Sequence, residues 1–427
     1  MQTFKSIRGF NDQLPETVKK IQAVEQTITA LLNSRGYQEI RTPVIEYQEL
    51  FKRSVGNDSD IVSKEMYTIE RANDKLFTLR PEGTVGVARA LLENGLVNTQ
   101  QKLWYNGYMF RAENPQKGRY RQFQQIGIEV YGIADVNIEV EVINMINKLF
   151  ADLQLSSAVS LEINTIGNAD DRAAYAKALI EYMTPYYNQL DNDVIQKFER
   201  NPLRILDNKD EKIKAMVKDA PCISRYINED STNKFSYLKE CLDCLGIQYV
   251  VNPRLIRGLD YYNDTVFEWT SNLSESQGTV CAGGRYDGLV TQLGGKPTPA
   301  FGCAIGVERL LLLIEESAVK LPENTTTQLV IAVMDKKNYL YAMNLQNKLL
   351  SDEFVKNGAN TYKVSLINEQ TSLKSQMKKA DKFNADYVLI IGESERNENS
   401  VTIKNMKTGE QFKLPVEQLA TIFNIDS

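Results

Sequence analysis

The chain has 427 residues, of which 42% are hydrophobic and 25% charged, and its formal net charge is −5. This length exceeds what a single hydrophobic core usually supports, so we expect two or three domains. The sequence contains no histidine, which excludes a Ser-His-Asp triad, a Cys-His pair and any histidine metal ligand. Catalysis by this chain would use carboxylates, arginine, lysine, tyrosine, cysteine or a bound cation, which favours charge-stabilised chemistry such as nucleotidyl transfer.

The sequence also limits which cellular compartment and which metal sites we expect. The N-terminus has no signal-peptide run, and no window reaches the roughly 18 apolar residues of a membrane helix, so we expect a cytoplasmic protein without a membrane partner. Cys241 and Cys244 form a single CxxC. No second cysteine pair stands at zinc spacing, so the pair is predicted to be buried in a helix and no metal site is expected.

The first predicted elements are a helix over about 15–35, with Gly36 as its stop, and an extended stretch that begins at Pro43. A second helix is predicted over 84–94. Aromatic and β-branched residues then predict two strands joined by a polar loop. The strands cover residues 103–111 and 123–132, and the loop covers 112–122.

Residues from about 170 to 246 are charged and helical, and they are predicted to form an insertion into the sheet domain. Strands return at 249–251 and 266–269. The glycine-rich segment 283–287 is interpreted as a turn with a charged tip, and 299–316 as a strand, a turn at Gly306 and a buried helix.

A linker is predicted at 321–327. Three strands then alternate with two helices, and two more strands and a last helix follow, which predicts a small α/β domain with a mainly parallel sheet. The predicted division is therefore residues 1–325, carrying the insertion at about 170–246, and residues 326–427.

A basic cluster spans positions 111 to 121, from the end of the first of these strands through the polar loop, and it contains four cations and one acid, Glu113. The cations are Arg111, Lys117, Arg119 and Arg121. Arginine offers planar, bidentate donors to phosphate oxygens, so a strand-loop-strand with this charge suits a triphosphate. A solvated hairpin with surface charges is the alternative.

Two further segments combine cations with residues suited to ligand contact. Arg257 precedes Tyr261 and Tyr262 by four and five residues, and the alternative here is a turn with packing tyrosines. Arg309 stands near the predicted start of the last helix of the sheet domain. A cation there has the wrong sign for the helix dipole, which favours a ligand role over helix-end electrostatics.

Together these segments resemble the three motifs of class II aminoacyl-tRNA synthetases, in order and in spacing. Pro43 fits motif 1, residues 110–113 fit the start of motif 2, and residues 306–309 fit motif 3. The segments Arg-Pro-Glu-Gly-Thr at 80–84 and Arg-Gly-Leu-Asp-Tyr-Tyr at 257–262 narrow the resemblance to histidyl-tRNA synthetases.

The resemblance covers essentially the whole chain. It implies an α+β class II catalytic domain, in which an antiparallel sheet of six or more strands is flanked by helices and carries a helical insertion. It also implies a C-terminal α/β anticodon-binding domain and a homodimer.

The implied activity is that of a histidine–tRNA ligase, which activates histidine with ATP and Mg²⁺ to histidyl-adenylate and transfers it to the 3′ end of tRNA(His). Arg111 and Arg257 are the implied catalytic residues. The implied ATP-binding residues are Arg111, Glu113, Arg119, Phe123 and Arg309. The implied histidine-binding residues are Glu82, Thr84, Arg111, Gln125, Glu129, Arg257, Tyr261, Tyr262 and Tyr286. Glu129 and Tyr262 would bracket the two imidazole nitrogens.

The chain departs from the family's usual pattern at two positions. Asn114 stands where the family usually has arginine, in the loop that helps to read the extra 5′ guanosine of tRNA(His), whereas Gln116 fits the pattern. Both are predicted tRNA contacts, and the way the tRNA end is read stays open. Gln124 stands where histidine is common.

Two alternatives are weighed against this interpretation. One is a catalytically inactive, synthetase-like regulatory subunit of histidine biosynthesis. Such paralogues usually lack the C-terminal domain and lose motif residues, whereas this chain has both the domain and the motif residues. The other is a class II synthetase for a different amino acid, against which the 257–262 segment and Glu129 argue.

Overall fold

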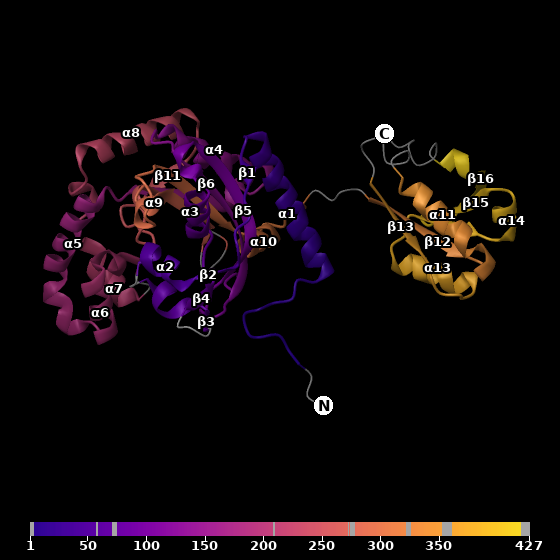
Figure 1. The fold of residues 1–427 in the computed structure, drawn as a ribbon, viewed down its shortest axis with the longest axis horizontal. Helices are drawn as coiled ribbons and strands as arrows, with labels where there is room; N and C mark the ends of the chain where they lie inside the picture. The colour runs from indigo at the N-terminus through magenta and orange to yellow at the C-terminus, as the bar shows by residue number, and fades with distance from the viewer. Residues whose placement is uncertain are drawn as a thin grey trace. The chain divides into compact units, whose positions relative to one another are not determined.

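The computed structural model describes residues 4–56, 59–70, 75–207, 210–271, 273, 278–321, 326–351 and 361–419. The chain divides into two compact units, Met1–Leu321 and Pro322–Ser427 (Figure 1). Within the described ranges, no helix is long and apolar enough to cross a membrane.

The first unit is built on an eight-stranded sheet with the order β1-β5-β6-β11-β10-β9-β7-β8. All of its inner pairings are antiparallel, and only the two edge pairs, β1 with β5 and β7 with β8, are parallel. In sheet order the strands are Gln38–Glu39, Gln101–Phe110, Gln122–Tyr131, Ala300–Gly306, Thr279–Arg285, Asn263–Ser271, Val159–Thr165 and Tyr249–Val251. This sheet confirms the predicted antiparallel, helix-flanked architecture.

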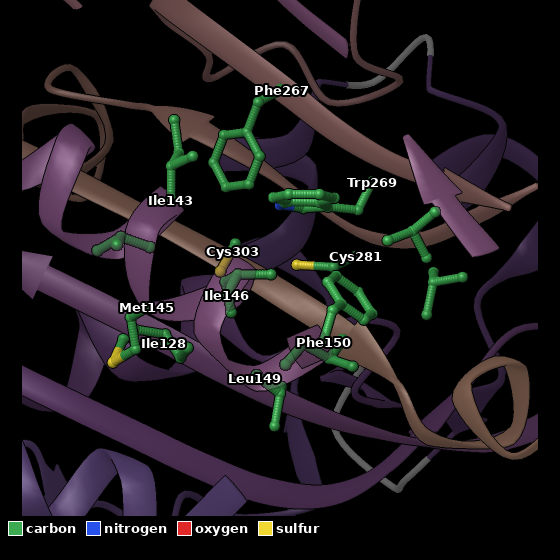
Figure 2. Close-up of a cluster of buried hydrophobic side chains, with 14 of the residues drawn as sticks. Ile128, Ile143, Met145, Ile146, Leu149, Phe150, Phe267, Trp269, Cys281 and Cys303 are labelled. Atoms are coloured by element: carbon green, nitrogen blue, oxygen red, sulfur yellow. The ribbon is translucent and has the colours of Figure 1, made fainter. Parts of the chain in front are cut away.

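One face of the sheet is covered by four long helices. These are α1 (Pro15–Ser34), α4 (Asn137–Asp152), α8 (Glu229–Cys244) and α10 (Val307–Glu316). Figure 2 shows the centre of this core, where Ile143, Ile146 and Phe150 of α4 lie against Trp269, Cys281 and Cys303 of the sheet. Such apolar burial is the main term that holds a sheet and its helices together.

The opposite face of the sheet carries the second core and further helices. Trp104 belongs to the first core and Tyr105 to the second, as expected for strand residues that alternate between faces. The helices here are α2 (Gln48–Val55), α3 (Thr84–Glu93), α9 (Leu289–Gln292) and the insertion helices α5 (Ala169–Met183), α6 (Asn192–Arg200) and α7 (Glu211–Met216). A small antiparallel sheet is formed by β2 (Ile45–Tyr47), β4 (Leu76–Leu79) and β3 (Thr68–Glu70).

The second unit is a five-stranded sheet with the order β13-β12-β14-β15-β16. Its strands are β12 (Thr326–Val333), β13 (Thr361–Leu366), β14 (Tyr387–Ile391), β15 (Ser400–Asn405) and β16 (Gln411–Pro415). Its helices are α11 (Tyr339–Leu349), α13 (Leu373–Lys382) and α14 (Glu393–Asn397), and α11 and α13 serve separate cores of this unit.

The prediction of a mainly parallel sheet holds for only part of the second unit. Strands β12, β13 and β14 pair in parallel, whereas β15 and β16 are added antiparallel, because the connections before them, residues 392–399 and 406–410, are shorter than the crossover that parallel strands need. Strand β12 begins at Thr326, inside the predicted linker. Residues 322–325 of that linker and most of the predicted last helix lie outside the described residues.

Most of the predicted elements are confirmed, and two local interpretations are wrong. Residues 283–285 do not form a turn, because they lie in the central strand β10. A Cβ at Gly283 would approach the carbonyl oxygen of Gly302 to 2.1 Å, so the glycine permits close strand packing. Cys241 and Cys244 do lie on a helix, but Cys241 is only half-buried and Cys244 is exposed.

The charged tip predicted at Arg285 is instead a buried ion pair. Its Nε donates to Oε1 of Glu139 on α4 at 2.5 Å, and both side chains are 2% exposed. We expect Arg285→Met to lower the free energy of unfolding by about 3–5 kcal/mol, because it leaves the Glu139 carboxylate buried without its partner.

Urea denaturation of the variant checks this expectation, beside the double variant Glu139→Leu/Arg285→Met. The double variant should regain most of the loss, because it buries no unpaired charge. Equal stability of the single variant and the wild-type protein would contradict the expectation.

Candidate active site

A cavity of about 160 Å³ opens over the middle of the large sheet, at the strands β5, β6, β10 and β11. Eleven of the predicted site residues line it. They are Glu82, Thr84, Arg111, Glu113, Arg119, Phe123, Gln125, Arg257, Tyr261, Tyr262 and Arg309. Glu129 and Tyr286 lie buried in contact with this lining, whereas Asn114 and Gln116 are exposed on the β5–β6 loop.

The alternation of strand β6 places residues from both halves of the cavity on one face. Phe123, Gln125, Gly127 and Glu129 are two residues apart and therefore point to the same side of the sheet. Gly127 has to be glycine, because a Cβ there would approach the ring of Tyr105 to 2.1 Å. One strand thus connects the end of the cavity beside the β5–β6 loop with its buried floor.

The half of the cavity near the β5–β6 loop is strongly basic. The Arg111 guanidinium lies 5.2 Å from the ring centre of Phe123, and its Nε donates to the carbonyl of Pro81 at 2.9 Å. Arg119 forms an ion pair with Glu113. The loop is closed by reciprocal backbone hydrogen bonds between Gln116 and Arg119.

Arg309 brings a third cation to this half of the cavity. Its Nη1 donates to the carbonyl of Thr279 at 2.6 Å. Burial, followed by the repulsion of Arg119 and Arg111, lowers the pKa of Arg309 to about 10. Cations that repel one another inside a half-buried cavity are stabilised by a bound polyanion, so this half of the cavity suits a triphosphate.

Arg257 lies on the loop that follows β8, and an ion pair fixes its guanidinium at the cavity. Its Nη1 donates to Glu268 on β9, and the second carboxylate oxygen of Glu268 accepts from Thr279 Oγ1 at 2.8 Å. The Nε of Arg257 is buried without a hydrogen-bond partner. A guanidinium fixed on one side keeps its other N–H groups available to a ligand, so Glu268 acts as a positioning residue.

We expect Glu268→Gln to reduce the turnover of any reaction that uses Arg257 by about 10- to 100-fold, because a small displacement of a positioned charge has that order of effect. Steady-state kinetics should show most of the loss in kcat, with Glu268→Asp recovering part of it. Glu141→Gln, which removes the acid of the Lys102–Glu141 ion pair elsewhere in the unit, is the matched control. A loss confined to KM would contradict the positioning role.

The buried half of the cavity contains two carboxyl groups. Glu82 precedes α3, where its two oxygens accept from the backbone N–H groups of Thr84 and Val85, both at 2.8 Å. Glu129 accepts from Thr84 Oγ1 at 2.7 Å and from the hydroxyl of Tyr286. Burial raises the pKa of both groups, that of Glu129 to about 8.

Tyrosine rings form a wall beside these carboxyl groups. The ring centres of Tyr261 and Tyr262 are 4.7 Å apart, and those of Tyr261 and Tyr286 are 5.5 Å apart. Polar acceptors at the floor and aromatic faces at the side suit a small planar group that carries N–H donors, such as imidazole.

Sequence reasoning missed four residues of this site. Tyr105, Thr279 and Glu308 line the cavity, and Glu268 holds Arg257. Both oxygens of Glu308 accept from the backbone N–H of Gln124 at 3.0 Å, and burial raises the pKa of Glu308 to about 7. Gly83 and Gly127 were the available signal for Tyr105, because a Cβ at either position would overlap its ring.

Sequence and structure comparisons show the family of the chain. Residues 9–310 match the histidyl-tRNA synthetase family, and residues 328–424 match an anticodon binding domain. The crystal structure of apo S. aureus histidyl-tRNA synthetase is similar, with 34% identity and a TM-score of 0.80, over 99% of this chain and 100% of that one.

Two more distant structures share the fold. A histidyl-tRNA synthetase from Nostoc sp. has 20% identity and a TM-score of 0.68, over 99% of each chain. An ATP phosphoribosyltransferase regulatory subunit/histidyl-tRNA synthetase from Bacillus halodurans has 20% identity and a TM-score of 0.62, over 89% of this chain and 97% of that one. Because the family match spans most of the chain and includes the residues that line the cavity, this protein belongs to the histidyl-tRNA synthetase family.

Proposed function

We propose that the chain is an active, cytoplasmic histidine–tRNA ligase. It would activate histidine with ATP to histidyl-adenylate, release pyrophosphate, and transfer histidine to the 3′ end of tRNA(His). One observation carries the proposal: a single cavity joins a cluster of arginines to a buried floor of carboxyl and tyrosine groups. An inactive paralogue has no need to retain both halves.

In this proposal the basic half of the cavity binds ATP. Arg119 and Arg309 hold the outer phosphates, Phe123 stacks on adenine, and Glu113 accepts from its amino group. Mg²⁺ enters with ATP and is held mainly by the phosphates, since Mg²⁺ commonly binds through one or two carboxylates and substrate phosphates. The carboxylate of Glu308 would fit that role, because it lines the same half of the cavity.

The buried half binds histidine. Glu82, Thr84 and Gln125 receive the α-amino group, Arg111 the carboxylate, and Glu129 and Tyr262 the two imidazole nitrogens. Arg257 then faces the α-phosphorus, where the histidine carboxylate forms its bond as pyrophosphate leaves with its electron pair. A fixed cation at that position stabilises the charge that develops on the α-phosphate oxygens.

Two further parts of the proposal concern partners. The second unit and the exposed Asn114 and Gln116 contact tRNA(His). The homodimer is supported by exposed apolar side chains close to Pro43, namely Val44, Ile45 and Tyr47, which are 40%, 52% and 53% exposed. Contiguous exposed apolar surface of this kind marks protein interfaces.

The test is the exchange of labelled pyrophosphate into ATP by the purified protein, with each amino acid in turn. Exchange that depends on histidine supports the ligase. Exchange with a different amino acid would reassign the substrate. A folded protein without exchange would instead point to a regulatory subunit of histidine biosynthesis.

A further inference from the structure

Strand β9 contains a bulge beside the buried half of the candidate active-site cavity. Its pairing with β10 shifts register between Gly284 and Arg285, and the two unmatched residues of β9 are Asp264 and Thr265. Asp264 has a φ of +47°, in the left-handed region that residues other than glycine rarely adopt. A bulge next to a site redirects neighbouring side chains, and Tyr262, on the cavity wall, comes two residues before Asp264.

The bulge and the ring of Tyr262 pack on one glycine of the neighbouring strand. A Cβ at Gly284 would approach the carbonyl oxygen of Thr265 to 2.5 Å and Cδ1 of Tyr262 to 3.0 Å. The ring centre of Tyr262 lies 6.2 Å from that of Tyr286, and the two planes make an angle of 84°. This edge-to-face contact is a favoured arrangement of aromatic rings. A shift of the bulge would therefore shift the Tyr262 ring within the cavity.

The side chain of Asp264 is buried at the bulge, and both of its carboxylate oxygens have partners. Oδ1 accepts from the hydroxyl of Ser231 on α8 at 2.5 Å, and Oδ2 accepts from Nδ2 of Asn263 at 3.1 Å. Oδ1 of Asn263 accepts in turn from the backbone N–H of Asp287 at 2.8 Å. Because Asp287 directly follows Tyr286, the carboxylate connects the bulge to the segment that carries this second tyrosine.

Both ends of the insertion meet at Asp264. Its backbone N–H donates to the carbonyl of Gly167 at 2.9 Å, and its carbonyl accepts from the N–H of Ile166 at 2.8 Å, in the segment that leads into α5. Ser231, the partner of its side chain, lies in the first turn of α8. A side-chain hydrogen bond of 2.6 Å joins the N-terminal ends of α5 and α8. The insertion therefore holds both the backbone and the carboxylate of Asp264.

We propose that Asp264 is a positioning residue for histidine binding. It fixes the bulge that places the Tyr262 ring beside the imidazole, and it takes its own position from the insertion. Asp264, one of the described residues, does not line the cavity, so it acts through Tyr262 and not by contact with the amino acid. The inference rests on the proposed ligase function and adds to it a residue that sets the affinity for histidine.

The test uses substitutions that separate the carboxylate from the backbone conformation. Asp264→Gly removes the carboxylate but adopts a positive φ without strain, and Asp264→Asn keeps one carbonyl acceptor. Ser231→Ala removes the donor on the insertion. Gln154→Gly is the matched control, because Gln154 is an exposed residue of the same unit with a φ of +57° and does not line the cavity.

We expect Asp264→Gly and Ser231→Ala to lower kcat/KM for histidine in pyrophosphate exchange about tenfold, as for the loss of one hydrogen bond to a charged group. Asp264→Asn should stay within about threefold of wild type, because it keeps part of the contact. KM for ATP should change less than about twofold in all variants, and Gln154→Gly should behave like wild type. Wild-type kinetics in both Asp264→Gly and Ser231→Ala overturn the inference, and so does an equal rise in KM for ATP.

A double-mutant cycle distinguishes positioning from a general loss of stability. Tyr262→Phe removes the hydroxyl that the proposed function places at an imidazole nitrogen. If Asp264 acts through Tyr262, adding Asp264→Gly to Tyr262→Phe should lower kcat/KM for histidine by less than about twofold, because the contact has already been lost. Effects that multiply in the double variant overturn the inference, since the two residues would then act independently.

Equilibrium binding of histidine, measured by titration calorimetry without ATP, separates this inference from the ligase function. Wild type should bind histidine about tenfold more tightly than Asp264→Gly. If this difference appears but wild type shows no exchange, the ligase proposal fails and the positioning role stands. If wild type exchanges pyrophosphate and Asp264→Gly binds histidine equally well, the ligase proposal stands and the inference fails.

Discussion

Arg257→Ala is expected to reduce histidine-dependent pyrophosphate exchange at least ~100-fold, in line with the loss of one transition-state donor. The guanidinium lines the candidate active-site cavity, is fixed by Glu268, and has a buried Nε without a hydrogen-bond partner. Its contribution should be largest when negative charge develops on the α-phosphate. The measurement is steady-state exchange over a range of ATP and histidine concentrations.

The interpretation of that measurement depends on where the loss appears. A fall in kcat with small changes in both KM values indicates a contact made mainly in the transition state. Arg254→Ala is the control, because Arg254 is an exposed cation on the same loop and does not line the cavity. If Arg257→Ala and Arg254→Ala behave alike, the catalytic assignment of Arg257 is wrong.

Glu129→Gln is expected to reduce kcat/KM for histidine by about 10- to 100-fold, the range for one hydrogen bond to a charged group. The amide keeps the size of the side chain, but its NH₂ group cannot accept from Thr84, from Tyr286 or from an imidazole N–H. KM for ATP should stay within about twofold, because Glu129 lies at the opposite end of β6 from Phe123. An equal rise in both KM values would contradict a role in binding imidazole.

The same variant has a signature in stability against pH. Burial raises the pKa of Glu129 from 4.5 to about 8, so between these values the folded chain binds more protons than the unfolded chain. Stability contributed by the protonated carboxyl therefore falls as pH rises from about 5 to 8. Denaturation at several pH values should show Glu129→Gln gaining stability relative to wild type over this interval. A pH-independent difference would contradict the raised pKa.

Elements that depend on local pattern could be predicted from the sequence. Helix α1 follows from apolar residues at helical spacing, and the β5–β6 hairpin follows from two aromatic-rich runs separated by a polar loop. The basic loop residues Arg111 and Arg119 were identifiable because their charges are close together in the sequence. Physical pattern and family resemblance pointed to the same segments.

Contacts between distant segments could not be predicted in this way. Arg285 seemed to belong to a charged turn, because nothing near it in the sequence signals that Glu139 lies 146 positions away and neutralises it. Glu268 reads as an ordinary polar strand residue until β9 and β10 pair and bring Thr279 and Arg257 to it. The packing of α4 on the sheet assembles the first of these charge networks, and the pairing of β9 with β10 helps to assemble the second. Neither contact can be read from short-range sequence patterns.

The absence of histidine from the chain has a spectroscopic consequence. When this protein is mixed with isotope-labelled histidine, every imidazole resonance belongs to the added amino acid, and none has to be separated from a protein background. Nitrogen chemical shifts of the bound ring would then report directly which ring nitrogen carries the proton opposite Glu129. The same spectra recorded across the titration of that carboxyl would follow a single proton between the protein and the amino acid.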